Sequence, residues 1–273
     1  MTNKSKIASK VYLCVIFLFL YLPIFVLIIY SFNESKKGVN FTGFSLKWYK
    51  ELLSNELIIS SLMNTLKVAF ISTIFATIIG TAAAVGIYSM KKIPRSIIMN
   101  ATYIPIMNPE IVTGISMMLL FVFFRNFVDF EFGIGTLVIA HITFNIPYVI
   151  LSVMPKLRQM NPYLYEAAQD LGCSPFQAFR KAVMPEIMPG VVSGFLIALT
   201  YSIDDFVISY FTSGASSQTL PITIYSMVRR KINPQINALS TLLFVSILII
   251  LIAKNIIEER KIRHAQKKEW DDD

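Results

Sequence analysis

YLYEAAQDLGCSPFQAFRKAVMPEIMP, residues Tyr163 to Pro189, is a long polar segment between two strongly apolar parts of the chain. Just before it, Asn161 is a preferred N-cap residue, and Pro162 suits the first position of a helix. Gly172 can end that helix because glycine readily adopts the left-handed backbone conformation. The segment therefore predicts a short first helix that ends at a glycine hinge.

A second helix is predicted directly after this hinge. Ser174 is a suitable N-cap, and Pro175 fits the first helical position. Pro185 and Pro189 are expected to break the helix, because proline lacks the backbone N–H that a helix interior needs. Two short helices joined at a glycine predict a compact protrusion on one face of a membrane.

The composition is that of a polytopic membrane protein. Of the 273 residues, 55% are hydrophobic and only 15% are charged, and the mean hydropathy is +0.60. The two cysteines, Cys14 and Cys173, are too few and too far apart to predict a disulfide framework or a metal site. The net charge of +8 comes from residues beside apolar segments, which favours membrane flanks over nucleic-acid binding.

Six apolar segments are long enough to cross a bilayer as helices. They are residues 11–32, 61–90, 97–124, 133–154, 187–211 and 236–257. The first resembles a signal peptide, but its apolar run is about twice the usual length and no A-x-A cleavage pattern follows it. We therefore expect an all-α protein with one six-span domain over residues 11–257, a loop at about 155–186, and tails at 1–10 and 258–273.

The distribution of basic residues predicts the orientation. Both termini and the loop at 155–186 fall on the side that carries sixteen lysines and arginines, against eight on the other side. Cytoplasmic loops carry the excess of basic residues in membrane proteins. Both termini and the loop are therefore expected in the cytoplasm.

Two patterns outside the loop predict local packing. Ala76, Gly80 and Ala84 recur at every fourth position of one span, where small residues let helices approach closely. Residues 45–53 form an amphipathic segment in which Leu46, Tyr49, Leu52 and Leu53 share one face, which predicts a short helix on the membrane surface.

Glu166, Ala167 and Ala168, followed by Gly172 and then Pro185, resemble the EAA loop of bacterial ABC importer permeases. The resemblance implies a MetI-like permease bundle whose coupling helix in this loop contacts a separate ATPase. A rigid helical loop also suits the transmission of a partner's motion. The alternative is that Glu166 only stabilises its own helix, where the helix dipole favours its charge.

Further segments resemble the spermidine/putrescine permeases of the PotC type. They are residues 44–49, 141–144, 203–211, 219–221, 224–227 and 233–241. The resemblance implies a bacterial inner-membrane importer built from two different permease chains, a pair of ATPase subunits and an extracytoplasmic polyamine-binding protein. ATP and Mg²⁺ would then bind the ATPase subunits, and this chain would need no cofactor.

Three acidic residues lie within the predicted spans, namely Glu110, Asp204 and Asp205. A carboxylate in hydrocarbon costs at least about 2.5 kcal/mol, so each is expected to face a cavity or a partner. Adjacent helix positions point about 100 degrees apart. We therefore expect Asp204 to face the substrate path and Asp205 to bond a neighbouring helix. Structural roles at helix interfaces remain the alternative for all three.

Other polar and aromatic residues are weaker candidates. Tyr201 is assigned to the substrate path, because an aromatic face attracts ammonium groups. Trp48 is assigned to the same path, with a role as an interface anchor as the alternative. His141 and Asn145 lie one helical turn apart and predict an interhelical hydrogen-bonded pair rather than a proton relay.

Three other functions compete with polyamine import. The chain contains no G-x-x-x-x-G-K-[ST] loop and would have to borrow its ATPase, so a carrier coupled to an ion gradient is one alternative. An ABC permease for another small solute is the second. An intramembrane aspartyl protease is disfavoured, because adjacent aspartates diverge and no G-x-G-D motif accompanies them.

Overall fold

The structure is a computed structural model that describes residues 3–35, 40–230, 234–246, 248–249 and 252. Almost all of the described residues are helical. The chain divides into two compact units, one formed by residues 57–223 and the other by residues 1–56 with 224–273.

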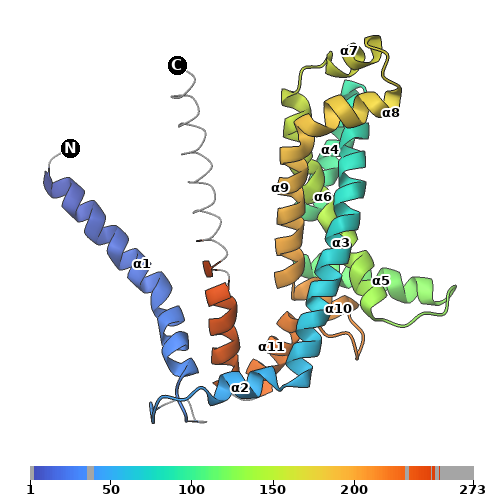
Figure 1. Cartoon of the computed structure of the whole chain (residues 1–273). Coiled ribbons are helices and arrows are strands. Elements are labelled where there is room, and N and C mark those ends of the chain that lie inside the picture. The colour runs from blue at the N-terminus through green and yellow to red at the C-terminus, as the bar shows by residue number, and fades with distance from the viewer. Residues whose placement is uncertain (1–2, 36–39, 231–233, 247, 250–251, 253–273) are drawn as a thin grey trace. The chain divides into compact units, whose positions relative to one another are not determined.

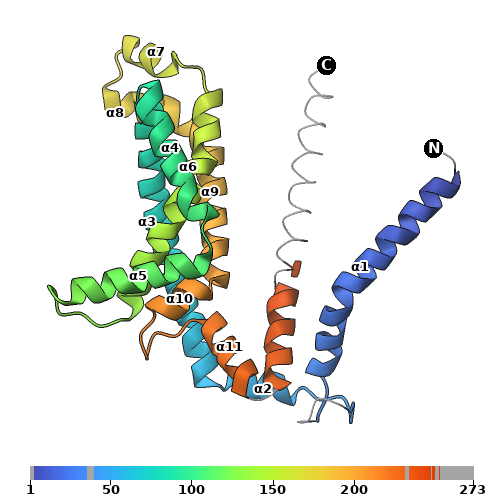
Figure 2. The ribbon, with the colours of Figure 1, turned by 180° about the vertical axis from the view of Figure 1, so that it is seen from behind.

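The larger unit is a bundle of helices with further helices at both ends (Figures 1 and 2). The bundle contains α3 (Glu56–Ser89), α4 (Lys92–Met107), α6 (Ile134–Gln159) and α9 (Met184–Asp204). At one end lie α7 (Leu164–Asp170) and α8 (Pro175–Ala178), and at the other lie α5 (Glu110–Arg125) and α10 (Val207–Thr212). The two ends of α9 therefore approach two different groups of helices.

Close packing of small residues holds this bundle together. Ala76, Gly80 and Ala84 are all buried on α3, which confirms their predicted role as a packing stripe. A Cβ atom at Gly80 would lie 2.7 Å from the Cβ of Val149 on α6. A Cβ atom at Gly190 of α9 would lie 2.8 Å from the backbone oxygen of Ser152, which is also on α6. Only glycine permits these approaches.

The predicted span over residues 97–124 is not one straight helix. The segment is a pair of helices, α4 and α5, bent by 102° relative to each other. Asn108 is extended, with φ −73° and ψ 143°, because the ring of Pro109 disfavours the helical conformation for the preceding residue. The break moves Glu110 from the middle of a span to the first residue of α5.

The predicted span over residues 187–211 is wrong at its C-terminal end, where the helix is interrupted. The helix α9 ends at Asp204, the backbone of Asp205 is extended, and α10 begins at Val207. At the other end, Pro185 and Pro189 do not break the helix. A π-helical turn, η1 (Phe179–Val183), joins α8 to α9, so Pro175–Asp204 forms one helix of 30 residues.

The π-helical turn explains why Pro185 is tolerated. Proline in an α-helix leaves one carbonyl without its donor, and its ring clashes with the carbonyl four residues earlier. The wider π turn directly before α9 changes that spacing, and Pro185 then occupies one of the first two positions of α9. The second loop helix therefore runs straight into the bundle.

The smaller unit contains α1 (Asn3–Ser31), α2 (Lys47–Leu53), part of α11 (Leu220–Arg230) and helical residues 234–246. The predicted short helix near residues 45–53 is present as α2, and its apolar side chains differ in burial. Leu46 and Leu53 are exposed, whereas Trp48 and Leu52 are buried. The indole of Trp48 donates a hydrogen bond of 2.6 Å to the carbonyl of Asn33, which fixes its orientation.

Among the described residues, four helices are long and apolar enough to cross a membrane. They comprise residues 9–31, 56–89, 134–159 and 175–204, and the bent pair α4 and α5 makes a fifth candidate span. Three parts of the predicted organisation lie outside the described residues. They are most of the second half of the span 236–257, the whole tail at 258–273, and residues 1–2 of the N-terminal tail. The fold is thus that of a multi-pass helical membrane protein.

Candidate functional site

A cavity of about 470 Å³ lies where the two broken spans meet. It is lined by Pro105, Ile106, Asn108, Pro109, Glu110, Thr113, Phe144, Tyr148, Tyr201, Asp204, Asp205, Phe206, Val207 and Ile208. The break between α4 and α5 supplies one side, the break between α9 and α10 supplies another, and α6 contributes two aromatic residues. Four of the five residues assigned to the path from the sequence therefore line one cavity.

All charged side chains that line this cavity, within the described residues, are acidic. Glu110 and Asp204 are exposed, and they are respectively the first residue of α5 and the last residue of α9. The carbonyl groups at the C-terminal end of α9 add partial negative charge beside Asp204. The cavity is therefore suited to attract a cation.

Two tyrosines form an aromatic pair in the same cavity. The ring centroids of Tyr148 on α6 and Tyr201 on α9 are 4.5 Å apart, and their planes are inclined by 31°. Tyr148 was missed by the sequence analysis. The available signal was its position three residues after Asn145, which places it on a neighbouring part of the same helical face.

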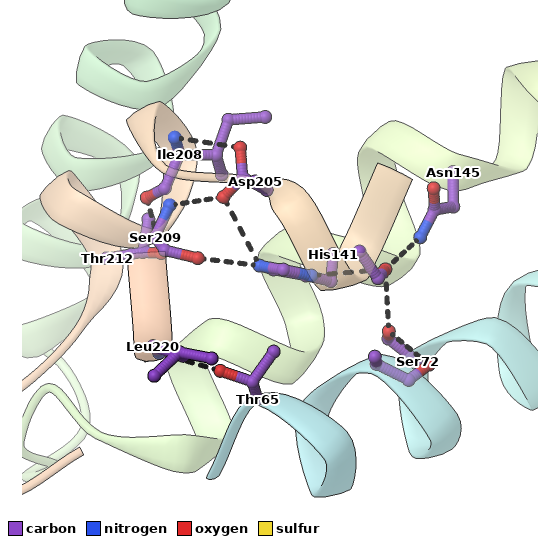
Figure 3. Close-up of polar contacts among 11 residues, drawn as sticks. Thr65, Ser72, His141, Asn145, Asp205, Ile208, Ser209, Thr212 and Leu220 are labelled. Carbon is purple, nitrogen blue, oxygen red and sulfur yellow. Dashed lines mark hydrogen bonds and ion pairs between the residues drawn. The ribbon is translucent and has the colours of Figure 1, made fainter. Parts of the chain in front are cut away.

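Asp205 is turned away from the open part of the cavity, and only 6% of its side chain is exposed. Its carboxylate accepts hydrogen bonds from the backbone N–H groups of Ile208, at 3.2 Å, and Ser209, at 2.7 Å. One of its oxygens lies 3.5 Å from Nε2 of His141 (Figure 3). Asp205 thus holds the start of α10 and joins it to α6.

His141 is the centre of a buried polar cluster (Figure 3). Its Nε2 lies 3.1 Å from the hydroxyl of Ser209, and its Nδ1 lies 3.2 Å from the hydroxyl of Ser202. Asn145 donates to that same Ser202 oxygen at 2.7 Å, and Ser72 of α3 lies 3.3 Å from it. The predicted interhelical role of His141 and Asn145 is confirmed, and their cluster connects α3, α6, α9 and α10.

Trp48 does not line this cavity. It belongs to the smaller unit, where 2% of its surface is exposed and its only ring nitrogen is bonded to Asn33. Burial of this kind gives Trp48 a packing role within its own unit. Its assignment to a substrate path has no geometric support in the described residues.

The loop at the other end of α9 has the caps predicted at Gly172 and Ser174. Gly172 has φ +84°, its N–H donates to Gln169, and the N–H of Cys173 donates to Ala168, which together form a Schellman motif. Ser174 and Gln177 form a capping box at the next helix. The first helix begins at Leu164, later than the Asn161 cap predicts.

The same loop carries exposed residues on a well-anchored base. On α7, Glu166 and Ala167 are exposed and Ala168 is half-buried. Gly172 and Pro185, which lie after α7, are also exposed. Leu164 and Tyr165 of α7 pack against the buried core of the bundle. Leu171 and Phe176 are 86% and 71% exposed, and large apolar side chains so exposed on a protrusion are typical of a surface that meets another protein.

The sequence matches the family model described as binding-protein-dependent transport system inner membrane component, over residues 76–263. The chain belongs to this family. It is also 36% identical to the spermidine/putrescine transport system permease protein PotC of Escherichia coli K12, over 92% of this chain and 94% of the relative. The putrescine transport system permease protein PotI of the same strain is 37% identical over 92% of each chain.

These matches identify the chain as a permease of the PotC type, which is a transport subunit and not an enzyme. Its fold is similar to that of a chain in the crystal structure of a bacterial alginate ABC transporter in complex with an alginate pentasaccharide-bound periplasmic protein. The TM-score is 0.71 at 16% identity, over 93% of this permease and 94% of that chain. A likeness at that identity concerns the fold and carries no information about cargo.

Proposed function

We propose that this permease moves polyamines such as spermidine or putrescine into a bacterial cell, as one half of a translocation path. The other half comes from a second, different permease subunit. An extracytoplasmic polyamine-binding protein delivers the substrate, and both termini of the chain are cytoplasmic. The relatives named for spermidine and putrescine support this substrate class.

The acidic cavity is the observation that carries the proposal. Polyamines are flexible carbon chains with several ammonium groups, and their charges need carboxylates when they leave water. Glu110 and Asp204 supply exposed carboxylates in one cavity, whose lining also includes apolar and aromatic side chains. An anionic solute would be repelled by this arrangement.

The coupling loop is the second part of the proposal. Two partner ATPase subunits bind ATP and Mg²⁺, and one of them contacts the exposed face around Glu166, Ala167, Ala168 and Gly172. The loop is suited to this contact because the turn between its two helices is capped on both sides and α7 packs on the bundle. Pro185 lies where the loop continues into α9, so a movement of the loop reaches α9 directly.

Uptake by the reconstituted importer tests the substrate and the energy source. The permease is purified with its partners, placed in liposomes and given the loaded binding protein. ATP supplied on the side of the ATPase subunits is expected to drive the uptake of radiolabelled spermidine or putrescine. A protonophore is expected to leave this uptake unchanged. Uptake that needs an ion gradient, or that occurs only with another solute, would overturn the proposal.

Asp204→Asn tests the acidic cavity. The substitution keeps the shape of the side chain but removes its charge, so polyamine uptake is expected to fall about tenfold while the complex with the ATPase still assembles. Asp129→Asn is the matched control, because Asp129 is exposed and lies outside the cavity. Unchanged uptake in Asp204→Asn would remove Asp204 from the path.

Glu166→Ala tests the loop. ATP hydrolysis is expected to continue without matching uptake, because the substitution alters the contact with the ATPase but leaves the cavity intact. The number of polyamines moved per ATP is the measurement. A normal ratio would mean that Glu166 only stabilises its own helix.

A further inference from the structure

The pair formed by Tyr148 and Tyr201 has no part in the hydrogen-bonded cluster around His141. The two residues come from different helices, α6 and α9, and their rings meet at a centroid distance of 4.5 Å. Both residues line the cavity that holds Glu110 and Asp204. Tyr201 is 41% exposed and Tyr148 is half-buried, so part of each ring remains open to the cavity.

We propose that Tyr148 and Tyr201 form an aromatic surface that holds an alkylammonium group of the substrate between the carboxylates of Glu110 and Asp204. This inference rests on the proposed function and adds the residues that favour an organic cation. An aromatic face attracts a cation and also packs against methylene groups. Carboxylates alone would attract a compact inorganic cation equally well.

The two rings are expected to contribute unequally to holding the cation. Tyr201 presents the larger exposed area and stands three residues before Asp204 on α9, so its ring and that carboxylate lie within one turn of each other. Tyr148 is less exposed and supports the ring of Tyr201 from α6. A contact of this kind contributes about tenfold to the binding of the cation, between the values for exposed and fully desolvated sites.

Substitutions that remove the ring test the inference in the complete importer. Tyr201→Leu is expected to lower the number of polyamines moved per ATP about tenfold, and Tyr148→Leu is expected to lower it less. Tyr201→Phe and Tyr148→Phe retain the aromatic faces and are expected to stay within about twofold of the unaltered importer. Tyr103→Leu is the matched control, because Tyr103 is exposed on α4 and does not line the cavity.

A second series keeps the shape of the side chain and changes only its electrostatics. Phenylalanine analogues with one, two and three ring fluorines at position 201 weaken the attraction of the ring for a cation in steps. Uptake per ATP is expected to fall in the same steps, whereas a ring that served only for packing would tolerate all three. This series remains informative if Tyr201→Leu does not assemble.

The outcomes are distinct. A stepwise loss with fluorination, together with normal Tyr201→Phe, supports the aromatic surface. A loss in Tyr201→Phe as large as in Tyr201→Leu overturns it, because the hydroxyl would then be the group that matters. Unchanged ratios in both leucine variants also overturn it. If the unaltered importer moves no polyamine at all, the proposed function itself fails and the inference fails with it.

Discussion

The two ends of α9 are held in place by different kinds of contact. Toward the loop, the helix continues through η1 into a segment whose caps come from residues within a few positions in the chain, such as Gly172 and Ser174. Toward the cavity, the helix stops at Asp204, and the next residue is bonded to α6 and α10. The loop end is thus fixed locally, and the cavity end depends on the whole bundle.

This difference indicates how each end responds to change. A substitution in the loop alters local order and leaves the bundle folded. A substitution at the cavity end leaves buried polar groups of several helices without partners, and each such group carries a large free-energy cost.

Asp205→Leu is expected to have the largest effect. It removes the acceptor of the Ser209 and Ile208 N–H groups and leaves His141 beside an apolar side chain, which should destabilise the bundle by about 3 kcal/mol. The apparent melting temperature of the purified complex is the measurement. Asp204→Leu is the matched control, because its side chain is exposed. Equal melting temperatures for both variants would contradict the comparison.

Gly80→Ala tests the close approach of α3 and α6. The added methyl group would meet Val149, so the variant should be destabilised by about 2 kcal/mol. Val149→Ala in the same chain should restore part of the loss, because it removes the side-chain atoms nearest to the new methyl group. Thermal unfolding of the two single variants and the double variant is compared. Additive losses would mean that the two residues do not meet.

Gly172→Ala tests whether the loop end of α9 is fixed by local contacts. A non-glycine residue in the left-handed conformation costs about 1 kcal/mol, and no heavy atom lies within 4 Å of the new Cβ position. Faster hydrogen exchange is therefore expected in residues 163–183, with the melting temperature of the complex nearly unchanged. Gly86→Ala is the control, since that added Cβ also has open space but φ is not in the left-handed region. A cooperative loss of the whole bundle would contradict a locally fixed loop.

Ser174→Ala is expected to have the smallest effect. It removes the hydroxyl that accepts from the N–H of Gln177, at a cost of about 0.5 kcal/mol because the cap is exposed. Hydrogen exchange should increase only in the first turn of α8. Ser174→Asp should restore protection, because aspartate is an equally good N-cap. Protection that does not differ between alanine and aspartate would exclude a capping role.

The difference between local and long-range contacts also explains what could be predicted from the sequence. Gly172, Ser174 and the stripe of Ala76, Gly80 and Ala84 were identified correctly, because caps and small-residue spacing are local signals. Pro109 indicates the break after Met107, whereas the break after Asp204 was not predicted. That second break follows no proline or glycine and depends on Asp205 reaching His141, 64 positions earlier in the chain.

The candidate site shows the same limit. Glu110, Asp204 and Asp205 were singled out because carboxylates in apolar spans are costly, and Tyr201 because its ring can attract a cation. The structure brings all four to one cavity. Tyr148 was missed because a tyrosine in a span is ordinary until a second ring stands against it. Trp48 was assigned to the path from its type and position, whereas its partner Asn33 is visible only in the folded chain.

The π-helical turn has a mechanical consequence. Because η1 joins α8 to α9 without a loop, Pro175–Asp204 is a single shaft of about 45 Å at the rise of an α-helix. A helix resists twisting and stretching far better than a loop does, so a rotation applied at Pro175 turns the carboxylate of Asp204 by a similar angle.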